Sequence, residues 1–199
     1  MGIIGGPRPS KMGLELRDMK PIILCFATAM LTIGPSVCQP PADVKGWGKI
    51  EWGMTVQEAK TAYGSQAETS TVVPGPSFTA IDRLAIPRIN IGDAKATASI
   101  QTKRGSDKVS SVAIQVGDEA DTPTVRSGNF DDTKKLLIEK YGQPKTEDRK
   151  PDNDYMRSIV VWTFPSTSIT LLLVESQRFD IGYVSISYEA VDKKALDAL

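Results

Sequence analysis

Two segments decide how this chain folds: residues 50–64, with the sequence IEWGMTVQEAKTAYG, and residues 128–142, with the sequence GNFDDTKKLLIEKYG. When the closing Tyr-Gly pairs at 63–64 and 141–142 are aligned, an aromatic residue and a threonine also coincide. Each segment is followed by three stretches that have the alternating pattern of β-strands. We therefore predict that one unit, a helix followed by three strands, occurs twice.

Both segments have the end signals of a short helix. In the first, Thr55 and Glu58 have the spacing of a capping box, in which each side chain binds a free backbone N–H. Gly64 can adopt the left-handed conformation that closes a helix. In the second, the aspartates at 131–132 are expected in the first turn and Lys140 in the last, which suits the helix dipole. Three apolar residues are predicted to form its buried stripe: Phe130, Leu137 and Tyr141.

The strand stretches alternate between apolar and polar residues, as expected of a sheet with one buried face. Their short turns favour antiparallel pairing. The run at 171–174 is apolar on both faces and predicts a central strand. The predicted inward residues are Leu84, Ile86, Ala96, Ala98, Ile100, Val112, Ile114, Val116, Val160, Trp162, Phe164, Ile169, Leu171, Leu173, Val184, Ile186 and Tyr188. The predicted fold is α+β: two tandem helix-plus-three-strand repeats form an antiparallel sheet with the helices on one face.

The first 38 residues have the layout of an export signal. Lys20 precedes an uncharged run at 22–33, which is too short for a permanent membrane span, and small residues follow it. We predict a leader at 1–38, a tether at 39–48 and one domain at 49–199, with repeats at about 49–121 and 122–199. Cleavage near 36–42 is favoured. The alternative is lipidation of Cys38, although the residues before it depart from the lipoprotein pattern.

The composition excludes several kinds of chemistry. The chain has 199 residues, with 24 Lys+Arg, 24 Asp+Glu and no His. Without His there is no Ser-His-Asp or Cys-His nucleophile and no His-based metal site. A net charge of zero argues against a nucleic-acid partner, which needs a basic face. We expect no cofactor, no metal and no catalytic residue.

The pattern Gly53-Met54-Thr55-x-x-Glu58-Ala59, together with Tyr141-Gly142-Gln143-Pro144 and the later Trp162-Thr163-Phe164, resembles a group of small envelope proteins. The group includes the outer-membrane assembly lipoproteins of the BamE/OmlA kind and β-lactamase inhibitory protein. The resemblance covers about half of the mature chain, and this sequence lacks the disulfides of the inhibitors. It implies an exported, non-enzymatic binding or assembly module, with no partner identified.

Two functions are weighed. The favoured one is an exported module, periplasmic or secreted, that binds another envelope or secreted protein through the open face of the sheet or a groove between the repeats. The alternative is a His-free hydrolase with two carboxylates in a cleft between the repeats. Glu175, which ends an apolar strand, is the acid expected to be partly buried. Trp52 and Trp162 are expected to be packing residues, whereas Trp47 has no assigned role. The binding residues are unknown at this point.

Overall fold

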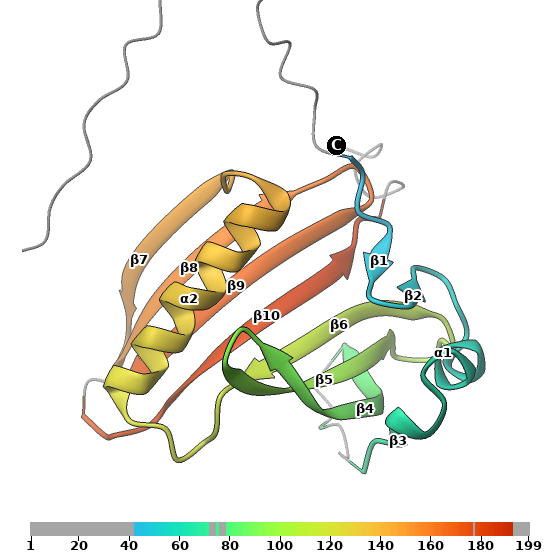
Figure 1. The fold of residues 1–199 in the computed structure, drawn as a ribbon, viewed down its shortest axis with the longest axis horizontal. Coiled ribbons are helices and arrows are strands. Elements are labelled where there is room, and N and C mark those ends of the chain that lie inside the picture. Colours follow the sequence, from blue (N-terminus) through green and yellow to red (C-terminus); the bar gives the residue numbers. More distant parts are fainter. Residues whose placement is uncertain (1–41, 72–74, 76–78, 177, 193–199) are drawn as a thin grey trace, which may run out of the picture. The chain divides into compact units, whose positions relative to one another are not determined.

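The computed structural model describes residues 42–71, 75, 79–176 and 178–192. The predicted leader and Cys38 lie outside the described residues. Eight strands form one sheet in the order β3-β4-β5-β6-β10-β9-β8-β7, and every neighbouring pair is antiparallel (Figure 1). The strands are β3 (Glu68–Thr69), β4 (Ala80–Ile91), β5 (Ala94–Lys103), β6 (Val109–Val116), β7 (Thr146–Asp152), β8 (Tyr155–Thr163), β9 (Thr167–Ser176) and β10 (Gly182–Ala190). The fold is therefore α+β with a dominant antiparallel sheet.

Each of the two helices is followed by four strands. Helix α1 (Val56–Tyr63) and a 3-10 turn (Gly64–Gln66) precede β3–β6, and helix α2 (Pro123–Tyr141) precedes β7–β10. The prediction of three strands after each helix missed one strand in each half. It missed β3, which has only two residues, and β7, which is exposed along almost its whole length. A strand exposed on both faces shows no apolar alternation, so the periodicity could not reveal β7.

The helix ends are mostly where the end signals placed them. Thr55 and Glu58 form the predicted capping box: the Glu58 N–H donates to Thr55 Oγ1 at 3.1 Å, and the Thr55 N–H donates to Glu58 Oε2 at 2.7 Å. Gly64 and Gly142 close the helices with φ of 57° and 81°. The start of α2 was predicted wrongly. It begins at Pro123 after the N-cap Thr122, so the aspartates at 131–132 lie in mid-helix.

The core lies on one face of the sheet. All the predicted inward residues are buried, and strand pairing places them on the same side. Phe130 and Leu137 of α2 and Ala59 of α1 belong to the same cluster. The Tyr141 ring packs edge-on against Tyr188 at 6.4 Å between ring centroids. Burial raises the pKa of the Tyr188 hydroxyl, and Tyr141 raises it further, so Tyr188 stays neutral. The strand of residues 171–174, β9, lies between β8 and β10, as predicted for a central strand.

The segment before α1 is docked onto the domain. Strands β1 (Gly46–Trp47) and β2 (Ile50–Glu51) pair with each other. The Asp43 carboxylate accepts hydrogen bonds from the backbone N–H (2.9 Å) and the hydroxyl (2.6 Å) of Ser166. The fully buried Thr167 donates to the Val44 carbonyl oxygen. Residues 43–48, which were predicted to be part of a tether, therefore belong to the folded domain.

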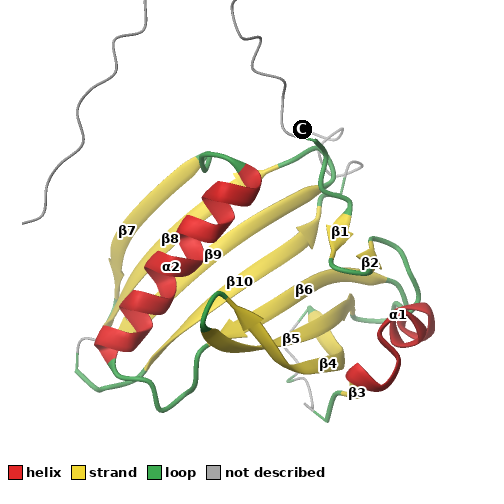
Figure 2. Ribbon diagram, viewed as in Figure 1, coloured by secondary structure: helices red, strands yellow, loops and turns green. Residues whose placement is uncertain are grey.

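The opposite face of the sheet is polar over β5, β6 and β10, and it has an apolar strip over β8 and β9 that includes Ile159, Val161 and Leu172. In the part of the chain that the structure describes, no helix packs on this face, and both helices contribute to the core on the other side (Figure 2). Small hydroxyl and amide side chains occupy its centre: Thr97, Ser99, Gln101, Gln115, Thr170, Ser185 and Ser187. They are half-buried or exposed. This surface is called the open face below.

Candidate binding site at one end of the sheet

Exposed apolar side chains gather at one end of the molecule. Among the described residues, six large apolar side chains are more than one-third exposed, and five of them come from this end. Here α2 begins, β7 turns into β8, and β9 turns into β10 (lower left in Figure 1). The five residues, called the apolar end below, are Val125, Tyr155, Phe179, Ile181 and Tyr183. Phe179 is 65% exposed and Ile181 50%. A cluster of this kind is typical of an interaction site.

Three residues of the apolar end line an open cavity of about 570 Å³. Tyr155, Ile181 and Tyr183 form its apolar wall together with Val174. Tyr183 pairs with Val174 across β10 and β9, and Val174 pairs with Arg157 of β8, so these side chains all lie on the open face. The cavity is of the size that accommodates a small ligand or the side chains of a partner.

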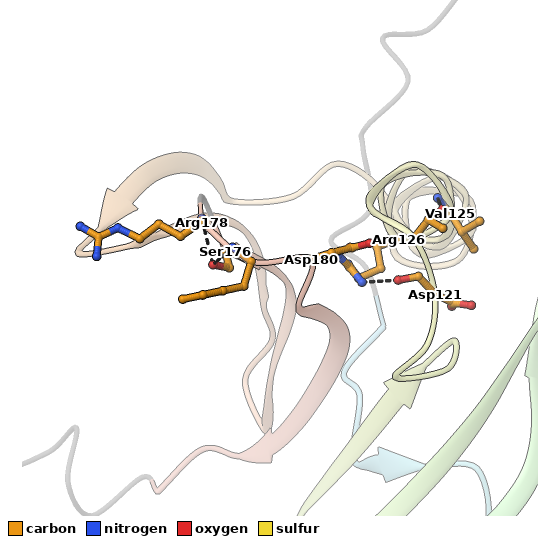
Figure 3. Close-up of polar contacts among 8 residues, drawn as sticks. Asp121, Val125, Arg126, Ser176, Arg178 and Asp180 are labelled. Carbon is orange, nitrogen blue, oxygen red and sulfur yellow. Dashed lines mark hydrogen bonds and ion pairs between the residues drawn. The ribbon is translucent and has the colours of Figure 1, made fainter.

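A buried arginine fixes the apolar end. The side chain of Arg126, in the first turns of α2, is only 3% exposed. Its Nη2 lies 2.9 Å from Oδ1 of Asp180, and its Nη1 donates to the carbonyl oxygen of Asp121 (Figure 3). The guanidinium thus joins the helix to the loop before it and to the β9–β10 loop. A buried charge is costly when unpaired, so Asp180 and its neighbours are held in place.

Gly182 makes room for this arginine. The Arg126 Nε is buried and has no hydrogen-bond partner among the described residues. A Cβ at position 182 would lie 2.9 Å from that Nε and would overlap the Val174 carbonyl oxygen. Only a residue without a side chain therefore fits beneath the guanidinium. The glycine is required here by close approach, since its φ lies outside the left-handed region.

The β9–β10 loop is held by further contacts. The Ser176 hydroxyl accepts hydrogen bonds from the backbone N–H of Arg178 (3.2 Å) and of Phe179 (3.0 Å). The Ser176 N–H donates to the Ile181 carbonyl oxygen at 2.9 Å. Arg178 lies 3.2 Å from Asp154 in the β7–β8 turn. The backbones of the exposed Phe179 and Ile181 are thus each hydrogen-bonded to Ser176, and contacts of this kind lower the entropy lost on binding.

The tryptophans are packing residues. Trp162 is 2% exposed and donates from Nε1 to the Gly142 carbonyl oxygen at 2.8 Å. Trp52 is half-buried and donates to Thr167 Oγ1 at 2.7 Å. Both therefore do what was predicted. Trp47 stacks on Tyr63 with 6.2 Å between ring centroids and so helps to hold the β1–β2 segment against α1.

Glu175 lines a groove separate from the apolar end. Glu175 is half-buried, as predicted, but it is not alone in this, since Asp82 and Asp121 are half-buried too. It shares with Asp131 and Glu147 a groove between α2 and strands β7–β9. This groove lies within the second half of the domain rather than between the halves. Lys134 of α2 lies 2.5 Å from Glu147 and neutralises one of these carboxylates. Within the described ranges, no group of three or more Cys, Asp or Glu residues could hold a metal ion.

The apolar end was not found from the sequence. Phe179 and Ile181 fall between the predicted inward residues Leu173 and Val184, and no role was predicted for them. Two large apolar residues outside the alternating pattern were the available signal. Neither contributes to the alternating face of a strand, so neither is needed for the core.

Comparison with known proteins gives no relative. No protein-family model matches the chain, and no curated protein or solved structure matches it. The resemblance to the small envelope proteins rests on the short motifs alone. None of the helices in the described part of the chain combines the length and apolar character needed to cross a membrane.

Proposed function

We propose that this protein is a non-enzymatic binding module that docks a partner protein on the apolar end. The observation that carries the proposal is that exposed apolar side chains stand beside residues anchored to the rest of the domain. Phe179 and Ile181 are at least half exposed, yet their loop is tied to α2 by Arg126 and Asp180. Exposed apolar residues have no stabilising role in the isolated domain. A partner that covers them gains hydrophobic contact with little ordering cost.

The composition of the site favours a protein partner. Tyrosine and arginine are enriched where binding energy concentrates in protein interfaces, and Tyr155, Tyr183 and Arg157 line the same cavity. The hydroxyl and amide side chains of the open face can form the rim of such an interface. The site is larger than the cavity, because Val125 and Phe179 extend it around the start of α2.

The module is proposed to be exported. The predicted leader at 1–38 supports this, and the periplasm or the extracellular medium is the proposed location. Modification of Cys38 would add a lipid anchor. The resemblance to envelope-assembly proteins of the BamE/OmlA kind supports an envelope or secreted protein as the partner.

The two halves are proposed to be copies of one unit. The order of a helix followed by four strands, present twice, supports this, and so do the two glycines that close the helices. The unit differs from the predicted one by its extra edge strand. In this proposal the second copy acquired the binding site.

Site-specific photo-crosslinking tests the binding function. Benzoylphenylalanine replaces Tyr183 in one variant and Leu136 in the control, in cells that make the protein. Leu136 is an exposed apolar residue of α2 away from the apolar end. We expect a discrete adduct from position 183 and none from position 136. Equal adducts at both positions, or none at position 183, would contradict the proposal.

The hydrolase alternative is supported only by the groove that contains Glu175. It is tested with Glu175→Gln in a screen against chromogenic glycosides. Turnover by the unmodified protein that disappears in this variant would favour the enzyme.

A further inference from the structure

The arginines of the apolar end are already paired. Arg126 binds Asp180 at 2.9 Å, and Arg178 binds Asp154 at 3.2 Å. Arg157, which lines the cavity, binds Asp152 at 2.7 Å. Each of these three arginines therefore has a carboxylate of the same chain beside it. An acidic segment of a partner would have to displace one of these aspartates before it could pair with any of the three.

One carboxylate in the cavity is left without a positive partner. Glu119, in the loop between β6 and α2, lines the cavity together with Tyr155 and Tyr183. It is exposed and forms no ion pair with any residue that the structure describes. Because Arg157 is paired with Asp152, the carboxylate of Glu119 is the charged group on the cavity wall that lacks an ion-pair partner among the described residues.

The aromatic walls add to this preference. The face of a tyrosine ring attracts a cation, and the attraction grows when water is excluded. The cavity thus offers two tyrosines and a carboxylate to a positive group, and Val174 and Ile181 to the alkyl chain that carries it. A lysine or arginine side chain combines these two features, an apolar stem and a charged head.

We propose that the cavity at the apolar end receives a basic side chain of the partner protein, held between Tyr155 and Tyr183 and paired with Glu119. This inference rests on the proposed function and specifies the chemistry of the partner. It describes a segment with an arginine or lysine flanked by apolar residues. The apolar flanks cover Phe179 and Ile181, and the basic side chain enters the cavity.

Three tripeptides test the charge preference. They are acetyl-Leu-Arg-Leu-amide, its neutral counterpart with citrulline, and its acidic counterpart with glutamate. Each is titrated into the ¹⁵N-labelled protein, purified in the form that its cells produce, and the amide shifts are followed. We expect the arginine peptide to shift the amides of Glu119, Tyr155 and Tyr183, with at least about fivefold weaker binding of the citrulline peptide. The glutamate peptide is expected to leave these amides unchanged.

Two variants make the test specific. Glu119→Gln removes the carboxylate and is expected to weaken the arginine peptide about fivefold. Asp93→Asn, at an exposed acid in the β4–β5 turn, is the matched control and is expected to change nothing. Equal binding of the arginine and citrulline peptides, preference for glutamate, absence of shifts, or an unchanged affinity in Glu119→Gln would overturn the inference. Crosslinking from position 183 would still occur in each of these cases if the partner binds through other contacts, so the two proposals fail separately.

Discussion

The turn before the last strand differs between the two halves of the domain. In the first half, residues 104–108 join β5 to β6 and dock on the start of α1 through the backbone. The Val56 N–H donates to the Asp107 carbonyl oxygen at 3.0 Å, and Thr55 forms a bridge with Lys108. In the second half, the β9–β10 loop docks on the start of α2 through the Arg126–Asp180 ion pair.

The two turns share the anchoring to a helix but differ in their exposed side chains. Both halves anchor this turn at a helix N-terminus, so the anchoring belongs to the architecture. The first turn is polar, with Arg104, Ser106 and Asp107, whereas the second contains Phe179 and Ile181. Because the first half folds with a polar turn, the exposed apolar residues of the second are a local addition. We attribute them to binding.

The substitution expected to destabilise the protein most disrupts the anchoring of the β9–β10 loop to α2. Gly182→Ala places a Cβ against the Arg126 Nε and the Val174 carbonyl oxygen, and strand and guanidinium must move apart. We expect a loss of about 2–3 kcal/mol in the free energy of unfolding, the range of an overpacked core. Urea denaturation measures it. The control is Gly128→Ala within α2, where nothing lies within 4 Å of a new Cβ and a gain of up to about 1 kcal/mol is expected.

The two tryptophan hydrogen bonds are expected to differ in strength. Trp162→Phe leaves the Gly142 carbonyl oxygen without its donor and creates a cavity in the core. We expect a loss of about 2 kcal/mol from these two causes. Trp52→Phe removes a bond from a half-buried ring, and about 1 kcal/mol is expected. Equal losses in thermal denaturation would show that the two halves are stabilised alike.

The N-caps of the two helices are expected to contribute unequally to stability. Thr55→Ala removes one side of a capping box and is expected to cost about 1 kcal/mol. Thr122→Ala removes a single, longer bond of 3.4 Å to the Val125 N–H, so a smaller loss is expected. Circular dichroism during urea titration gives both values. A larger loss for Thr122→Ala would show that α2 depends on its cap more than its length and packing indicate.

The smallest effect concerns pH. Hydrogen bonds from the backbone N–H and the hydroxyl of Thr55 lower the pKa of Glu58 below its ordinary value of 4.5. The folded state therefore gains stability above that value and loses the gain as the pH falls through the lower pKa of the folded state. Glu58→Gln has no carboxyl group at this position, so this pH-dependent contribution to stability is absent. We expect the stability advantage of the native chain over Glu58→Gln to shrink below pH 4.5; an advantage independent of pH would contradict this.

The sequence predicted the parts of the fold that are buried on one face only. Alternation identified the inward residues of β4–β6 and β8–β10, because the pleat places every second side chain in the core. It missed β7 because that strand lies at the sheet edge with charged side chains on both faces, a composition that discourages pairing with other chains. The early start of α2 was missed although Thr122 and Pro123 are a clear N-terminal signal.

The candidate binding site depends on contacts between distant segments, so no local pattern contains it. Arg126 and Asp180 are 54 positions apart, and Tyr155 meets Tyr183 only after β8, β9 and β10 have paired. The sequence gives the type of each side chain, but the order of the strands in the sheet decides which of them lie close together. The same holds for Glu119, which is one of several exposed acids until the fold places it beside the two tyrosines.

The double variant Phe179→Ser/Ile181→Ser asks whether the exposed apolar residues serve binding rather than stability, because stability and crosslinking are measured on the same protein. Both side chains are at least half exposed, so we expect the free energy of unfolding to change by less than about 0.5 kcal/mol per residue. The adduct from benzoylphenylalanine at position 183 is expected to fall at least about tenfold, as for residues that dominate an interface. An unchanged adduct, or a loss of stability that accounts for its disappearance, would contradict the assignment of the apolar end to binding.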